Sequence, residues 1–270
     1  MKALDELLTV LPPPKRPLHN RGDWATVEAA LGLRLPPDFK AFIAAYGRGT
    51  INNCLEIESP FGLKEDVRKW WGNFAAYFDT VAEYEPLPYP IYPQAGGLLP
   101  FGTLGDVDIL NWRTAGEPEE WPFVYYDRTE GFFEIKGLAA VEFVLEAVTR
   151  RSPLLARLGS ESVFSPACDF EAYTPEPHYV QLVHPREMDI DGLVKRFAGR
   201  WPSEQVRIRR RASGDGVRVL AEPLDGSLSI SREGDERTWV RVNYDQSRAA
   251  EADAIVAELL NMDFTICGRM

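Results

Sequence analysis

Histidines and cysteines, which often serve as nucleophiles, acid–base groups or metal ligands, are few and widely spaced in this sequence. They are His19, His178, His184, Cys54, Cys168 and Cys267. No Cys-x-x-Cys pair or zinc-spaced cluster occurs, and the common motifs of serine hydrolases, P-loop proteins, zinc metalloproteases and dinucleotide-binding folds are absent. Cys168, His178 and His184 fit no standard ligand spacing, so we interpret the histidines as loop residues. We expect no catalytic residue, no metal and no cofactor.

The one basic cluster lies at residues 207–211. If this segment is a strand, Arg207, Arg209 and Arg211 share one of its faces, because side chains alternate between the two faces. A strip of this kind is typical of surfaces that bind anions or RNA. We favour a solvated sheet face balanced by Glu204 and Asp215, because residues 159–270 hold 14 basic against 19 acidic residues.

Acidic residues beside aromatic ones form the pattern best suited to binding a protein. The two candidate patches are Glu117, Glu119 and Glu120 in a loop beside Trp112 and Trp121, and Glu56 with Glu58 on a strand. Aromatic rings supply buried area at an interface, and carboxylates attract a basic partner. The alternative is that both tryptophans belong to the core and the acids only solubilise the loop.

The charge balance also favours a basic protein as partner. The 270 residues include 41 acidic and 30 basic ones, a net charge of -11. This field repels nucleic acid, although a local basic patch would act against it. The N-terminal segment contains acidic residues where a signal peptide needs an uninterrupted apolar stretch. No apolar run approaches the ~20 residues that span a bilayer. We expect a soluble, cytoplasmic protein that binds neither nucleic acid nor membrane; its oligomeric state is left open.

The elements that must position these patches fall into two groups along the chain. In the first, apolar spacing predicts helices before residue 85, one of which begins at Pro36-Pro37 and buries Phe39, Phe42, Ile43 and Tyr46 beside Trp24. Short strands are expected near residues 98–101, 107–112, 123–126 and 132–135, followed by a helix near 138–148. This order predicts an α+β domain over residues 1–158.

The second group begins after a segment rich in proline. Residues 159–185 lack periodicity and are expected to form a linker or packed loop. Beyond it, alternating segments predict strands near residues 206–209, 217–220, 228–230 and 239–242, with helices near 193–197 and 249–260. Residues 186–270 are therefore expected to form a second, smaller α+β domain.

Three segments of the first domain each carry a distinctive pattern, and the three follow one another in a fixed order along the chain. Residues 24–47 place Glu28, Gly32, Leu35-Pro36 and Tyr46-Gly47 along two helices. Residues 98–102 are Leu-Leu-Pro-Phe-Gly, and residues 112–122 are Trp-Arg-Thr-Ala-Gly-Glu-Pro-Glu-Glu-Trp-Pro. In order and spacing, these segments resemble the SUKH superfamily over roughly residues 20–150.

This resemblance implies a binding fold without catalytic activity. The superfamily is known mostly from immunity proteins of bacterial contact-dependent and polymorphic toxin systems, with a eukaryotic branch of regulatory scaffold proteins. The implied function is neutralisation of a toxin by direct, stoichiometric binding, with specificity in loops and exposed strand faces. The alternatives are a regulatory or scaffold protein of the same fold, and an enzyme with its site in the C-terminal domain or at the domain junction.

Overall fold

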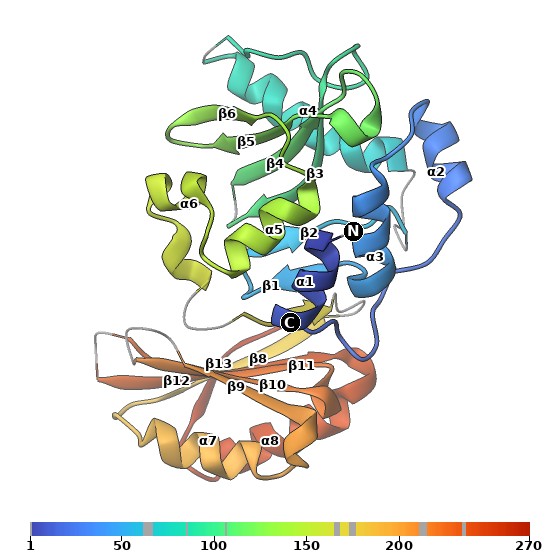
Figure 1. Cartoon of the computed structure of the whole chain (residues 1–270). Coiled ribbons are helices and arrows are strands. Elements are labelled where there is room, and N and C mark those ends of the chain that lie inside the picture. Colours follow the sequence, from blue (N-terminus) through green and yellow to red (C-terminus); the bar gives the residue numbers. More distant parts are fainter. Residues whose placement is uncertain are drawn as a thin grey trace. The chain divides into compact units, whose positions relative to one another are not determined.

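The computed structural model describes residues 2–61, 67–84, 86–105, 107–164, 168–172, 177–210, 215–233 and 236–270. The chain divides into two compact units, Met1–Tyr173 and Thr174–Met270. Each unit has its own antiparallel sheet and its own hydrophobic core (Figure 1). The expected α+β class is therefore confirmed.

Three helices open the N-terminal unit: α1 (Lys2–Val10), α2 (Trp24–Leu31) and α3 (Pro37–Tyr46). The Asp23 carboxylate starts α2 by accepting a hydrogen bond from a backbone amide of the first turn, and Gly32 ends it with a left-handed φ of 67°.

The apolar face of α3 is buried as the sequence predicts. Phe39, Phe42, Ile43 and Tyr46 are each at most 2% exposed. Trp24 is only half-buried and packs at the margin of the same core, with its ring 6.3 Å from that of Phe39.

A seven-stranded sheet with the order β6-β5-β4-β3-β2-β1-β7 forms the centre of the N-terminal unit, and all neighbouring strands are antiparallel. Its strands are β1 (Gly49–Ile51), β2 (Leu55–Ile57), β3 (Leu98–Leu104), β4 (Asp108–Arg113), β5 (Phe123–Asp127), β6 (Gly131–Ile135) and β7 (Phe170–Ala172). The four strands predicted between residues 98 and 135 correspond to β3–β6.

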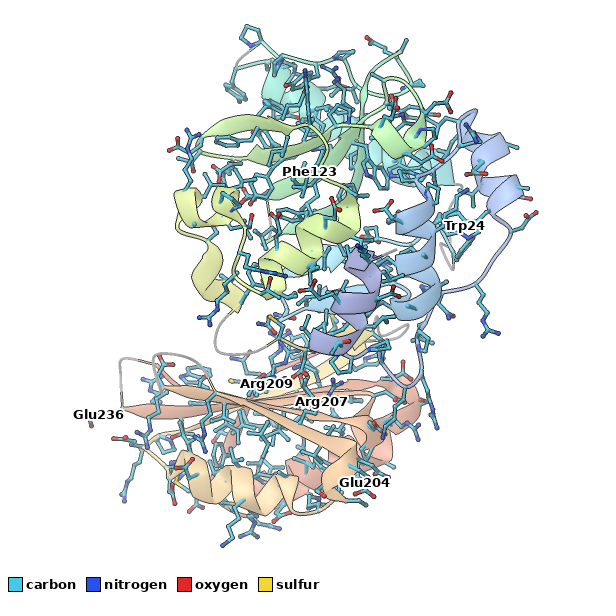
Figure 2. All side chains as sticks on the ribbon, in the orientation of Figure 1. Trp24, Phe123, Glu204, Arg207, Arg209 and Glu236 are labelled. Carbon is cyan, nitrogen blue, oxygen red and sulfur yellow. The ribbon has the colours of Figure 1, made fainter. Side chains whose placement is uncertain are left out.

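Helices cover both faces of this sheet. One face packs into the large core with α1, α3, α5 (Ala140–Val148) and α6 (Pro153–Leu158), a core that includes Phe123 (Figure 2). The opposite face packs against α4 (Val67–Ala82) through Phe78. α4 is one of the helices that apolar spacing predicts before residue 85.

The C-terminal unit is a six-stranded antiparallel sheet with the order β13-β8-β12-β11-β10-β9 and helices α7 and α8 on one face (Figure 1). Its elements are β8 (Pro177–His184), α7 (Ile190–Ala198), β9 (Val206–Arg210), β10 (Gly216–Ala221), β11 (Gly226–Glu233), β12 (Arg237–Asp245), α8 (Ala249–Leu260) and β13 (Thr265–Arg269). The described part also contains the 3-10 helices η1 (Pro118–Glu120), η2 (Glu161–Phe164), η3 (Ser203–Gln205), η4 (Glu222–Leu224) and η5 (Gln246–Arg248).

The segment 159–185 differs from a linker in one respect. It supplies β7 to the N-terminal sheet and β8 to the C-terminal sheet. The boundary between the two units falls inside this segment, between Tyr173 and Thr174, while residues 165–167 and 173–176 lie outside the described ranges. The division into 1–158, 159–185 and 186–270 remains a prediction.

Candidate partner-binding surface

The acidic loop predicted as a binding patch connects β4 to β5. Gly116 has a φ of 88°, which turns the chain away from β4, and Pro118 begins the short helix η1. The side chains of Glu119 and Glu120 are exposed, and neither has a hydrogen-bond or ion-pair partner among the described residues. Glu117 is exposed too, but its carboxylate lies 2.5 Å from the Arg34 guanidinium. The loop thus presents two unpaired carboxylates and one paired carboxylate.

The two tryptophans beside this loop are buried, in agreement with the alternative that both belong to the core; their part in partner binding stays a prediction. Trp112 is 2% exposed; its ring stacks on Phe101 with centroids 4.3 Å apart. Trp121 is 7% exposed, and its indole N–H donates to the carbonyl of Gly116 over 3.2 Å. Trp112 lies on the face of the sheet that α3 covers, with its ring 4.9 Å from that of Phe39. Both tryptophans therefore belong to the core.

A small pocket opens beside the two tryptophans. Its volume is about 70 Å³, and it is lined by Pro36, Asp38, Trp112, Pro118, Glu119, Glu120, Trp121, Gly137, Leu138, Ala139 and Ala140. These residues come from the start of α3, from β4 with η1, and from the start of α5. We call it the η1 pocket.

Two further carboxylates near the η1 pocket cap a helix. Asp38 accepts a hydrogen bond from the amide of Val141 over 3.2 Å, and Glu142 accepts one from the amide of Ala139 over 3.1 Å. These bonds offset the positive end of α5. The unpaired negative charge at the pocket therefore resides on Glu119 and Glu120.

The second candidate patch, Glu56 and Glu58, is occupied by a cation of the chain itself. The Arg48 guanidinium lies 2.6 Å from Glu58 and 3.2 Å from Glu56. Glu58 is only 7% exposed, and this burial raises its pKa to about 7, against the opposing effect of Arg48. Because Arg48 already pairs with both carboxylates, they offer a basic partner less than unpaired ones would, and their part in partner binding stays a prediction.

Arg48 was missed by sequence reasoning. It follows Gly47, which ends α3. The register of the β1–β2 hairpin, which pairs Thr50 with Glu56, places residue 48 beside residue 58. The signal in the sequence was the alternation of Glu56 and Glu58 on one strand of a short hairpin, with Arg48 just before the other strand.

The other residues singled out in the sequence do not form a common site. Arg207 and Arg209 lie on the edge strand β9, where Arg209 pairs with Arg218 of β10 (Figure 2), and residue 211 lies outside the described ranges. His178 and His184 lie on β8 rather than in a loop, which corrects that interpretation. Within the described residues, no group of three His, Cys, Asp or Glu side chains is arranged to hold a metal. The described helices include none long and apolar enough to cross a membrane.

Comparison with known families decides the nature of the N-terminal unit. Residues 20–140 match the model of the SMI1/KNR4 family (SUKH-1). The N-terminal unit therefore contains a SUKH-family domain. SUKH domains are in general associated with immunity proteins and are generally non-catalytic. No curated protein and no solved structure matches the chain.

The SUKH match covers α2, α3, α4, the strands β1–β6 and the η1 loop (residues 114–122, between β4 and β5), and it ends at the first residue of α5. All of the residues that line the η1 pocket therefore lie inside the match. The C-terminal unit lies outside the match.

Proposed function

We propose that this protein is an immunity protein that neutralises a bacterial toxin by direct, stoichiometric binding. The SUKH domain over residues 20–140 carries the proposal, because this family is in general associated with immunity proteins. The toxin belongs to a contact-dependent or polymorphic toxin system. Binding takes place in the cytoplasm, a reducing compartment in which three free cysteines, including exposed Cys267, persist.

The proposed contact surface is the η1 loop. Glu119 and Glu120 are exposed and unpaired in the described part of the chain, and Glu117 adds a carboxylate whose exposed ion pair with Arg34 costs little to break. The net charge of -11 attracts a basic toxin over a longer range. Affinity itself then rests on groups that become desolvated in the complex.

The first experiment asks whether a toxin binds at all. The full-length protein is co-expressed with the product of the gene beside its own, purified through a tag on one partner, and tested for inhibition of that product's toxicity. We expect a complex of fixed stoichiometry and survival of the host cell. If the neighbouring product is toxic and neither binds nor is inhibited, the proposal is wrong.

The second experiment tests the surface by charge reversal. Glu117→Lys, Glu119→Lys and Glu120→Lys together should slow association about tenfold at low salt and flatten its salt dependence, because steering acts mainly on the association rate. The purified complex from the first experiment supplies the toxin for these kinetics.

A matched control separates local from overall charge. Asp79→Lys, Glu83→Lys and Glu130→Lys change the net charge by the same amount at exposed positions in and after α4 and after β5. If the control set slows association as much as the η1 set, the overall field acts and the η1 loop is not the contact surface.

A further inference from the structure

Two arrangements in the described part of the N-terminal unit combine a cation, an aromatic ring and a carboxylate. Lys40 lies 5.7 Å from the ring centroid of Trp24 and pairs with Glu28. This geometry joins cation–π attraction to an ion pair, so the ring and the carboxylate hold the same cation.

The second combination has the same parts in another place. The Arg113 guanidinium lies 5.7 Å from the ring centroid of Tyr89 and 2.9 Å from the Glu134 carboxylate. The SUKH domain therefore uses this three-part arrangement for both kinds of basic side chain.

The η1 pocket contains two of these three parts. Trp112 and Trp121, which are 2% and 7% exposed, line its floor, and Glu119 and Glu120 supply carboxylates. Among the described residues that line it, none is a lysine or an arginine. Arg34, at the nearby rim, is already paired with Glu117. The pocket is thus complete except for its cation.

The shape and charge of the pocket restrict the occupant. Its volume of about 70 Å³ is several times the ~10–15 Å³ that one water needs, so it admits the end of one long side chain. Asp38 and Glu142 already offset the positive end of α5, so that helix end does not cancel the attraction of Glu119 and Glu120.

We propose that the η1 pocket receives one arginine side chain of the partner protein. A planar guanidinium presents several N–H donors to two neighbouring carboxylates and fits against the small apolar area that the buried tryptophans leave exposed, whereas an ammonium is a single, strongly hydrated charge. The partner's arginine then completes the arrangement that Lys40 and Arg113 complete elsewhere. This inference rests on the proposed function for the identity of the partner, but its chemistry is testable without the toxin.

The probe is N-acetyl-arginine amide, titrated into the full-length protein while the indole N–H signals of the tryptophans are followed by NMR. N-acetyl-citrulline amide, which has nearly the same shape but no charge, is the matched control ligand. We expect a saturable shift of the Trp121 signal with arginine and about tenfold weaker binding of citrulline, the size of one charge-assisted hydrogen bond.

Two variants make the test specific for the pocket. E119Q with E120Q removes both charges and should abolish the difference between arginine and citrulline. D79N with E83Q removes two exposed charges in and after α4 and should leave the difference unchanged. No saturable shift with arginine, an equal response to citrulline, or an equal loss in both variants would overturn the proposal.

The outcomes also separate this inference from the proposed function. A toxin complex that forms equally well with E119Q and E120Q leaves the immunity function in place and overturns the arginine pocket. Specific arginine binding without any toxin complex supports the pocket and counts against the immunity function.

Discussion

Replacing Phe42 by alanine tests how the SUKH core is built. Phe42 is 2% exposed on α3, its ring stacks on Tyr46 with centroids 4.6 Å apart, and it meets Phe170 edge-on at 6.2 Å. Loss of the buried ring costs about 2–3 kcal/mol, and the cavity with the lost ring pairs adds about 1–2 kcal/mol. We therefore expect the free energy of unfolding to fall by about 3–5 kcal/mol.

The measurement is urea unfolding followed by tryptophan fluorescence, in which most of the signal reports the N-terminal unit because five of the seven tryptophans lie there. Ala44→Ser, on the exposed side of the same helix, is the control and should change stability by less than about 0.5 kcal/mol. A cost below about 1 kcal/mol for Phe42→Ala, with the fold intact, would refute the placement of α3 against the sheet.

Two other outcomes follow from the same structure. Burial raises the pKa of Glu58 to about 7, above the ordinary value of 4.5, so the folded state holds the extra proton between these values. The stability that this proton contributes is therefore present below pH 4.5 and lost as the pH rises through about 7. Glu58→Gln should remove this loss when the free energy of unfolding is measured from about pH 4 to about pH 8. An unchanged pH profile in the variant would contradict the prediction. Limited proteolysis should cleave first within residues 159–185, where the unit boundary lies; earlier cleavage inside α3 or α5 would place the boundary elsewhere.

Much of the N-terminal fold was predictable because its helix ends carry local signals. Asp23 and Gly32 bracket α2, and Pro36 precedes α3, each by an effect that involves only neighbouring residues. Strands β7, β8 and β13 were not predicted. β7 has three residues, too few for a period, and β13 contains a bulge between Ile266 and Gly268 that breaks its alternation.

The exposure of the two tryptophans could not be predicted from alternation. In β4, Trp112 and its neighbour Asn111 point to opposite faces, yet both are at most 2% exposed, because α3 covers one face and α4 the other. When both faces of a sheet are covered, the period of two no longer distinguishes buried from exposed positions. The acidic loop could be found from its composition, whereas the pocket beside it is formed by segments about 100 residues apart.

The positions that shape the fold and the two carboxylates proposed to attract a partner are different residues of the same loops and helices. Pro36 precedes α3 and Gly116 turns the chain after β4, whereas Glu119 and Glu120 face solvent at the η1 pocket. Substituting a buried motif residue disturbs packing, whereas substituting an exposed glutamate changes only the charge presented at the rim. A SUKH domain can therefore keep its fold while the rim of this pocket changes to match another partner, and exchange of Glu119 and Glu120 alone should alter binding without altering stability.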